Sequence, residues 1–192
     1  MELLSDYVKT YKLPDEFLNS SVTLLNDEWR PHQWYTRDKD NRHEEDNDPS
    51  VNYVLSDDAT KTFLPVFWDI ISQYEKDISQ CDPDITSEKM VSYFSAIRIN
   101  VYEEGKLLRK HSDLIYSCFD HVKDPASRGI PLLSIVGDLS TDPYTGGEFY
   151  MRGQDAQLRP GHAIIFPSTF MYSHEVKPVL SGTRTSFVTW AW

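Results

Sequence analysis

Residues 58–80 alternate apolar and polar side chains in steps of three and four. The apolar positions are Phe63, Val66, Phe67, Ile70, Ile71, Tyr74 and Ile78. Since this spacing gathers apolar side chains on one side of a helix, it predicts an amphipathic helix that packs against a sheet. Pro65 is expected in its first turn or at a kink, because proline lacks the amide hydrogen that a helix interior needs.

Two segments before this helix differ in character. Residues 14–28 carry a partial helical stripe, and the macrodipole favours the acids near its start, so a second helix is expected there. The stripe consists of Phe17, Leu18, Val22, Leu24 and Leu25, with Asp15 and Glu16 before it. Residues 36–50 are polar without periodicity and predict a solvated loop. Its Arg42, His43 and Glu44 are expected at the surface rather than in a site.

The second half of the chain shows the two-residue alternation of strands. Between residues 93 and 102, Ile97, Ile99 and Val101 fall on one side, and Arg98, Asn100 and Tyr102 fall on the other. Further strands are expected over residues 131–139, 157–166, 174–180 and 184–192, with turn residues at 143–147, 160–161 and 181–182. Several short strands separated by such turns predict an all-β sandwich or barrel.

Length and charge narrow the class of protein. A chain of 192 residues is long enough for one domain with a sizeable core. Its 40% hydrophobic and 13% aromatic residues are typical of a globular protein. The net charge of −11 argues against a general phosphate-binding surface but does not exclude a local basic patch. We therefore expect no nucleic-acid partner, and nothing here indicates an oligomeric state.

The cysteines and the apolar runs bear on the cellular compartment. Cys81 and Cys118 show no metal-binding spacing, and residues 1–6 lack a basic region followed by an apolar run. No apolar stretch approaches the roughly 20 residues of a membrane span. We therefore expect a soluble cytoplasmic protein without membrane association. Both cysteines are expected as buried free thiols, with a disulfide as the alternative.

The candidate chemistry starts from His111 and Asp113, followed by His174 and Arg184. Residues two apart on a strand point to the same side, so His111 and Asp113 can reach one metal. Two imidazoles and one carboxylate on one face of a metal are the ligand set of non-haem Fe(II) oxygenases, but they also suit zinc or manganese. His174 and Arg184 suit two antiparallel strands joined by a turn, with both side chains facing one cavity.

Several ordered motifs carry a family resemblance. They are Tyr102 to Gly105 with His111 and Asp113, Leu139-Ser140 with Gly146 to Phe149, and Leu158, Pro160-Gly161 and Phe166 to Ser168 before His174. Over residues 92–192 the chain resembles the 2-oxoglutarate- and Fe(II)-dependent dioxygenases of the prolyl 4-hydroxylase type, within them the PKHD-like branch of bacteria and viruses. Five motifs in this order are much more specific than one His-x-Asp, which by itself also occurs at polar strand ends.

The resemblance implies a fold and a reaction. The fold would be mainly β, a double-stranded β-helix or jelly-roll with supporting helices. It would form one dioxygenase domain over residues 1–192, with a helical support region and loop at 1–90 and the catalytic β core at 91–192. The reaction would hydroxylate an unactivated C–H bond of a prolyl residue, or of another amino acid, peptide or small molecule. Fe(II), 2-oxoglutarate and O2 would be required, succinate and CO2 released, and ascorbate is allowed as a reductant.

The resemblance also assigns roles. His111, Asp113 and His174 would bind the metal, and the presence of Asp113 favours hydroxylation over halogenation. Arg184 would neutralise the distal carboxylate of 2-oxoglutarate, since a guanidinium binds carboxylates bidentately. Tyr102 and Ser134 would place hydroxyl groups on the cosubstrate, the alternative being that these hydroxyls only pack or bond to the backbone.

One position departs from the family. Asp138 stands where many of these enzymes have a cosubstrate-binding tyrosine, and an ionised aspartate cannot donate to a carboxylate. We therefore leave Asp138 out of the expected site. The cosubstrate would then rest on fewer donors, or Arg98 or Asn100 would replace the missing one.

Some assignments stay open at this stage. Residues 118–129 are either a lid or a plain connection. His121 and His162 complete no motif and are expected at the surface or behind the ligands. The rival functions are a non-catalytic cupin-like metal-binding protein, which would release no succinate, and a metal-dependent hydrolase, which would need neither oxygen nor 2-oxoglutarate.

Overall fold

The larger of two facing sheets has seven antiparallel strands. The computed structural model describes residues 5–15, 18, 29–32, 35–37, 42–44, 51–82, 84–85, 89–113 and 131–192. In spatial order the strands are β1 (Lys9–Lys12), β12 (His162–Pro167), β8 (Leu133–Asp138), β15 (Arg184–Ala191), β6 (Ile97–Tyr102), β5 (Asn52–Ser56) and β2 (Arg30–Pro31).

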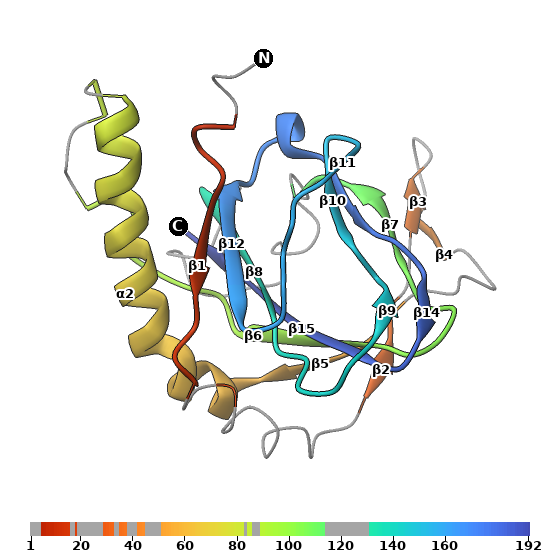
Figure 1. Cartoon of the computed structure of the whole chain (residues 1–192). Coiled ribbons are helices and arrows are strands. Elements are labelled where there is room, and N and C mark those ends of the chain that lie inside the picture. The colour runs from red at the N-terminus through yellow and green to blue at the C-terminus, as the bar shows by residue number, and fades with distance from the viewer. Residues whose placement is uncertain are drawn as a thin grey trace.

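The smaller sheet lies across from the larger one (Figure 1). Its order is β11 (Gln154–Asp155), β10 (Phe149–Met151), β13 (His174–Val176) and β7 (Leu108–His111). Two further pairs are β14 (Val179–Ser181) with β9 (Thr145–Gly146), and β3 (Tyr35–Arg37) with β4 (Arg42–Glu44). A short 3-10 helix, η4 (Phe170–Tyr172), precedes β13. The predicted mainly-β fold class is confirmed.

The central strands of the larger sheet, β12, β8, β15 and β6, are largely buried on both faces, which explains their apolar residues. All six residues of β8 are buried. Neighbouring residues along a strand enter opposite cores, because successive side chains point to opposite faces. Ile135 packs toward α2 (Asp57–Cys81), whereas Val136 packs between the two sheets. The inter-sheet core also contains Phe149 and Val176 of the smaller sheet.

Helix α2 covers the outer face of the larger sheet (Figure 1). The prediction of an amphipathic support helix is confirmed, since its buried residues are Ala59, Phe63, Phe67, Ile70, Ile71, Tyr74 and Ile78. The placement of Pro65 in the first turn is wrong. Pro65 lies in the third turn and is exposed, so its ring is accommodated on the solvent side of the helix.

Several expectations for the first half of the chain change. The predicted loop over residues 36–50 contains most of the β3–β4 pair, because two short strands form without an apolar alternation to announce them. Most of the predicted helix over residues 14–28 lies outside the described residues, as does Cys118. Cys81 is free as expected but exposed rather than buried, because it ends α2.

The first 90 residues contribute strands as well as a helix. β1 and β5 belong to the same sheet as β6, β8, β12 and β15. Because the helical support region and the β core share one sheet, we propose that the chain forms a single domain. No helix among the described residues is long and apolar enough to cross a membrane.

Candidate active site

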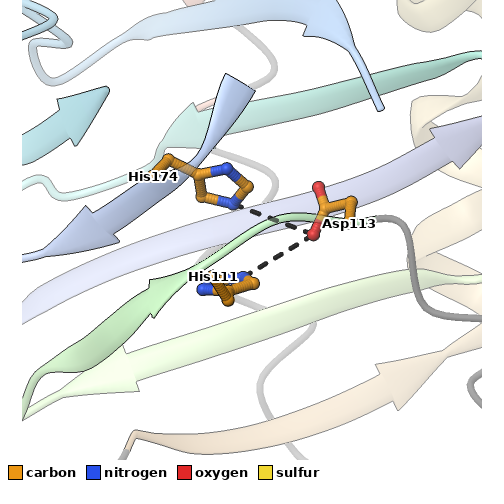
Figure 2. Close-up of side chains that lie close together, drawn as sticks. All are labelled: His111, Asp113 and His174. Atoms are coloured by element: carbon orange, nitrogen blue, oxygen red, sulfur yellow. Dashed lines mark ion pairs between the residues drawn. The ribbon is translucent and has the colours of Figure 1, made fainter. Parts of the chain in front are cut away.

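A cross-strand pair brings two histidines together. His174 on β13 lies opposite His111 on β7, and Asp113 follows just beyond the end of β7. Asp113 Oδ1 lies 3.6 Å from His111 Nε2 and 3.7 Å from His174 Nε2. The three side chains converge on one point (Figure 2), and their ligand atoms all lie within 4.8 Å of one another. The structure thus brings the three predicted metal ligands together.

Backbone carbonyl groups orient both imidazole rings. His111 Nδ1 donates to the carbonyl oxygen of Arg109 at 2.7 Å, and His174 Nδ1 donates to that of Tyr172 at 3.0 Å. A carbonyl oxygen only accepts, so each Nδ1 carries the hydrogen and each Nε2 keeps its lone pair. This is the usual way in which a hydrogen bond on one ring nitrogen prepares the other for a metal.

The protonation states also suit a divalent metal. Burial and the neighbouring His174 lower the pKa of His111 to about 4. Burial opposes ionisation of Asp113, but His174, His111 and the Ser134 hydroxyl outweigh it and hold the pKa of Asp113 below its ordinary value. Neutral imidazole and ionised carboxylate are the forms that bind metals. The residues present therefore fit a divalent ion.

The Ser134 hydroxyl contacts one of the three metal-ligand candidates. Its hydroxyl donates to Asp113 Oδ2 at 2.6 Å, and its side chain is fully buried. Neither Ser134 nor Arg184 is among the described residues that line the pocket beside the triad. Ser134 therefore contacts the Asp113 carboxylate, and its expected contact with the cosubstrate stays a prediction.

A pocket opens beside the three converging side chains. The apolar lining comes from both sheets, with Leu108, Phe149 and Val176 from the smaller one and Val136, Val188 and Trp190 from the larger one; the polar lining includes His32, Arg98, Asn100, Tyr102 and Ser186. Phe149 and Phe166 pack on His174, with ring centroids 5.3 and 5.1 Å away. Such a lining restricts water at the histidines.

Arg184 and Tyr102 form a second cross-strand pair. Arg184 on β15 lies opposite Tyr102 on β6, with its guanidinium carbon 5.1 Å from the ring centroid. Both side chains are buried. Arg184 Nη1 and Nη2 have no hydrogen-bond partner in the described part of the chain. Buried donors without partners are rare, so this edge of Arg184 suits a bound anion.

The predicted pairing of the strands that carry His174 and Arg184 is wrong. β13 belongs to the smaller sheet and β15 to the larger one, with β14 between them in the chain. Pro178 removes a backbone donor after β13, and β14 pairs with β9 instead. The two side chains thus belong to different sheets.

Sequence reasoning missed the partner of Arg184. Asp138 Oδ2 lies 3.3 Å from Arg184 Nε and accepts a hydrogen bond of 2.6 Å from Tyr144. Burial disfavours the guanidinium charge, but Asp138 together with Tyr102 and Tyr144 outweighs burial, so the pKa of Arg184 is raised. A signal was present in the sequence: an aspartate at the end of an apolar strand needs a buried partner.

The remaining candidates are distributed around this site. Arg98 and Asn100 line the pocket as the alternation predicted, and Arg98 Nε donates to Asn100 Oδ1 at 2.8 Å. Their expected contact with the cosubstrate stays a prediction. His162 is half-buried at the start of β12, and within the described residues it is not part of the triad cluster. His121 and residues 118–129 lie outside the described residues.

Residues 97–192, half of the chain, match the family model of the 2OG-Fe(II) oxygenase superfamily. The chain belongs to this superfamily. The recognised resemblance is confirmed, and the protein is a dioxygenase that uses Fe(II), 2-oxoglutarate and O2. The rival assignments to a non-catalytic cupin-like protein and to a metal-dependent hydrolase are therefore set aside.

Solved structures share the fold. A prolyl-4-hydroxylase from Pseudomonas putida aligns with a TM-score of 0.63 and 18% identity over 99% of this chain and 95% of its own. A prolyl hydroxylase from Trichoplax adhaerens, in complex with a hypoxia-inducible factor peptide fragment, gives 0.65 and 14% over 100% and 86%.

The viral collagen prolyl hydroxylase of Paramecium bursaria Chlorella virus-1, in a 2OG complex, gives a TM-score of 0.57 and 14% identity over 96% of this chain and 95% of its own. At these identities the likeness shows the fold, and the predicted double-stranded β-helix is confirmed. No curated protein sequence matches the chain.

Proposed function

We propose that His111, Asp113 and His174 bind Fe(II), and that Arg184 with Tyr102 binds the distal carboxylate of 2-oxoglutarate. The observation that carries this proposal is the presence of two matching sets of groups. Three ligand atoms converge within 4.8 Å, and a buried guanidinium presents two donors that have no partner among the described residues. A metal would complete the first site and a carboxylate the second.

The chain's own groups then have distinct tasks. Asp113 neutralises part of the metal charge, and the hydrogen bonds on the two Nδ1 atoms hold the rings in place. The apolar lining of the pocket limits access of water. When bound, Fe(II) with 2-oxoglutarate and O2 supplies the oxidising power that converts C–H to C–OH, with release of succinate and CO2.

The proposed substrate is a prolyl residue in a peptide. Three solved structures with this fold are described as prolyl hydroxylases, and that from Trichoplax adhaerens holds a peptide fragment. Those descriptions concern those proteins, and fold by itself does not fix substrate. The proposal of a prolyl substrate for this chain is supported by the shared fold together with the His-Asp-His cluster and the pocket beside it.

A matched pair of peptide libraries tests the substrate. The protein is incubated with Fe(II), 2-oxoglutarate and either proline-containing peptides or the same peptides with alanine at each proline. Succinate release and a mass gain of one oxygen are expected with the proline set alone. The His174→Ala variant serves as the control for metal-independent decarboxylation. Equal turnover of both sets would exclude prolyl hydroxylation while leaving the dioxygenase assignment intact.

A further inference from the structure

The two oxygens of the Asp113 carboxylate have different surroundings. Oδ1 faces both histidines, at 3.6 Å from His111 Nε2 and 3.7 Å from His174 Nε2. Oδ2 faces away and lies 2.6 Å from the hydroxyl of Ser134. Ser134 in turn lies 2.7 Å from the hydroxyl of Ser168. Since Ser134 and Ser168 are 0% and 1% exposed, water does not supply these hydrogen bonds.

The number of available hydrogens determines which group donates in each of these two hydrogen bonds. An ionised carboxylate only accepts, so Ser134 must donate its single hydroxyl hydrogen to Asp113. Ser134 can then only accept from Ser168, which must be the donor of the second bond. The order is therefore Ser168 to Ser134 to Asp113. Each hydroxyl that accepts a bond becomes a stronger donor to the next group.

The sheet brings these groups together from distant parts of the sequence. β8 and β12 are neighbours in which Ser134 lies opposite Phe166, so Ser168, two residues further on, comes next to Ser134. Ser134 projects from a strand whose six residues are all buried. A hydroxyl in such a strand needs a partner, and Asp113 provides it.

We propose that Ser134 and Ser168 are positioning residues that hold the Asp113 carboxylate so that Oδ1 alone faces the metal. The proposal rests on the proposed function, in which Asp113 is a metal ligand. With Oδ2 occupied by Ser134, the carboxylate binds through one oxygen. Three protein atoms then leave three positions of an octahedral ion open, two for a bidentate keto acid and one for oxygen. A carboxylate bound through both oxygens would take one of these positions.

The test measures metal binding rather than turnover. Mn(II) replaces Fe(II) as a probe that is stable in air, and its free concentration is read from its electron paramagnetic resonance signal. Ser134→Ala, Ser168→Ala and the double variant are compared with the wild type. Loss of a hydrogen-bond partner behind a metal ligand typically weakens metal affinity by about 10–100-fold. We expect this loss for Ser134→Ala and a smaller loss for Ser168→Ala.

The double variant separates a connected chain of hydroxyls from two independent packing effects. If Ser168 acts through Ser134, adding Ser168→Ala to Ser134→Ala changes Mn(II) affinity no further. Ser140→Ala is the matched control, because Ser140 is buried and bonds to the backbone of Thr185 without a path to the metal. Its Mn(II) affinity should equal that of the wild type.

Other outcomes overturn the proposal. Wild-type Mn(II) affinity in Ser134→Ala, or additive losses in the double variant, would show that the hydroxyls do not position Asp113. Thermal unfolding of the metal-free variants shows whether a loss of Mn(II) affinity is caused by misfolding. If Ser134→Ala does not fold, Ser168→Ala still tests the proposal, because it keeps the hydrogen bond from Ser134 to Asp113. Asp113→Ala distinguishes a failure of this positioning proposal from a failure of the proposed metal site. Unchanged Mn(II) affinity in Asp113→Ala would refute the metal site itself.

Discussion

Asp138 and Arg184 form a buried ion pair, with Oδ2 of the aspartate 3.3 Å from Nε of the arginine. Tyr144 donates to the same carboxylate oxygen at 2.6 Å. The pair engages only the Nε side of the guanidinium, while Nη1 and Nη2 find no partner in the described residues. Arg184 thus has a counter-ion before any cosubstrate binds, and its remaining donors are already oriented.

Removal of this counter-ion should destabilise the metal-free protein. Asp138→Leu leaves the Arg184 charge buried and unpaired, which typically costs about 3–5 kcal/mol. The double variant Asp138→Leu/Arg184→Met should regain much of that loss, because neither charge remains. Urea unfolding of the wild type, the single variants Asp138→Leu and Arg184→Met, and the double variant measures the coupling. Additive losses in the double variant would mean that the pair does not act as a unit.

Arg184 should determine the affinity for 2-oxoglutarate. Removing the charged partner of a buried carboxylate typically costs about 2–5 kcal/mol. Arg184→Ala should therefore weaken 2-oxoglutarate binding strongly while Mn(II) affinity stays close to wild type. Calorimetric titration of the Mn(II)-loaded protein measures this. Because Arg184→Ala leaves Asp138 without its partner, the same titration is made on Asp138→Leu/Arg184→Met, in which neither charge remains. A change below about threefold, less than 1 kcal/mol, would contradict the assignment.

His174 should be required for the metal complex. Without oxygen, the wild type with Fe(II) and 2-oxoglutarate should show a weak visible charge-transfer band, because the keto acid binds the metal. His174→Ala removes one of three protein ligands and should abolish the band. His162→Ala is the control, since His162 bonds to the carbonyl of Pro160 at 3.1 Å instead. A band that persists in His174→Ala would remove His174 from the site.

Asp113 should be essential for turnover but dispensable for folding. Asp113→Ala removes a metal ligand, and Asp113→Glu displaces the ligand oxygen by more than a metal bond tolerates. Both should abolish succinate release. Metal-free melting midpoints should stay within about 4 °C of wild type, equivalent to about 1 kcal/mol for a chain of this size. A collapsed fold would make Asp113 a structural residue instead.

Gly147 should affect the affinity for 2-oxoglutarate through its contact with Arg184. It has a φ of +68°, and a Cβ there would lie 3.0 Å from Arg184 Cδ. Gly147→Ala should therefore lower stability by about 1–2 kcal/mol and also weaken 2-oxoglutarate binding. Gly153→Ala is the matched control, because its φ is +82° but a Cβ there meets nothing within 4 Å. Gly153→Ala should show the loss of stability with unchanged binding.

The sequence was most informative where periodicity and spacing act locally. The apolar stripe of α2 predicted a helix and its buried side, and the alternation from Ile97 to Tyr102 predicted a strand, because side-chain direction follows the geometry of helix and strand. The spacing of His111 and Asp113, with His174 as a third ligand, likewise indicated one cluster.

The errors arose where partners are far apart in the chain. Nothing next to Ser134 in the sequence shows that Asp113 accepts its hydrogen bond, because β8 meets the end of β7 only in the folded protein. Asp138 was left out because an ionised aspartate cannot donate to a carboxylate. The structure shows that Asp138 instead binds Arg184, the residue proposed to donate to that carboxylate. The strands of His174 and Arg184 were paired wrongly because a ten-residue connection was read as one hairpin, although it contains β14.

The two cross-strand pairs of the site stand on opposite walls of the β-helix. His111 and His174 belong to the smaller sheet, whereas Tyr102 and Arg184 belong to the larger one. The separation of the walls is maintained by the side chains packed between them, Val136, Phe149, Ile164, Phe166 and Val176 among others. In the proposed site, this packing fixes how far the metal lies from the guanidinium. If the proposed site is right, we expect the inter-sheet core to select the carbon-chain length of the keto diacid, so that an enlarged or trimmed core residue would favour a longer or shorter homologue of 2-oxoglutarate.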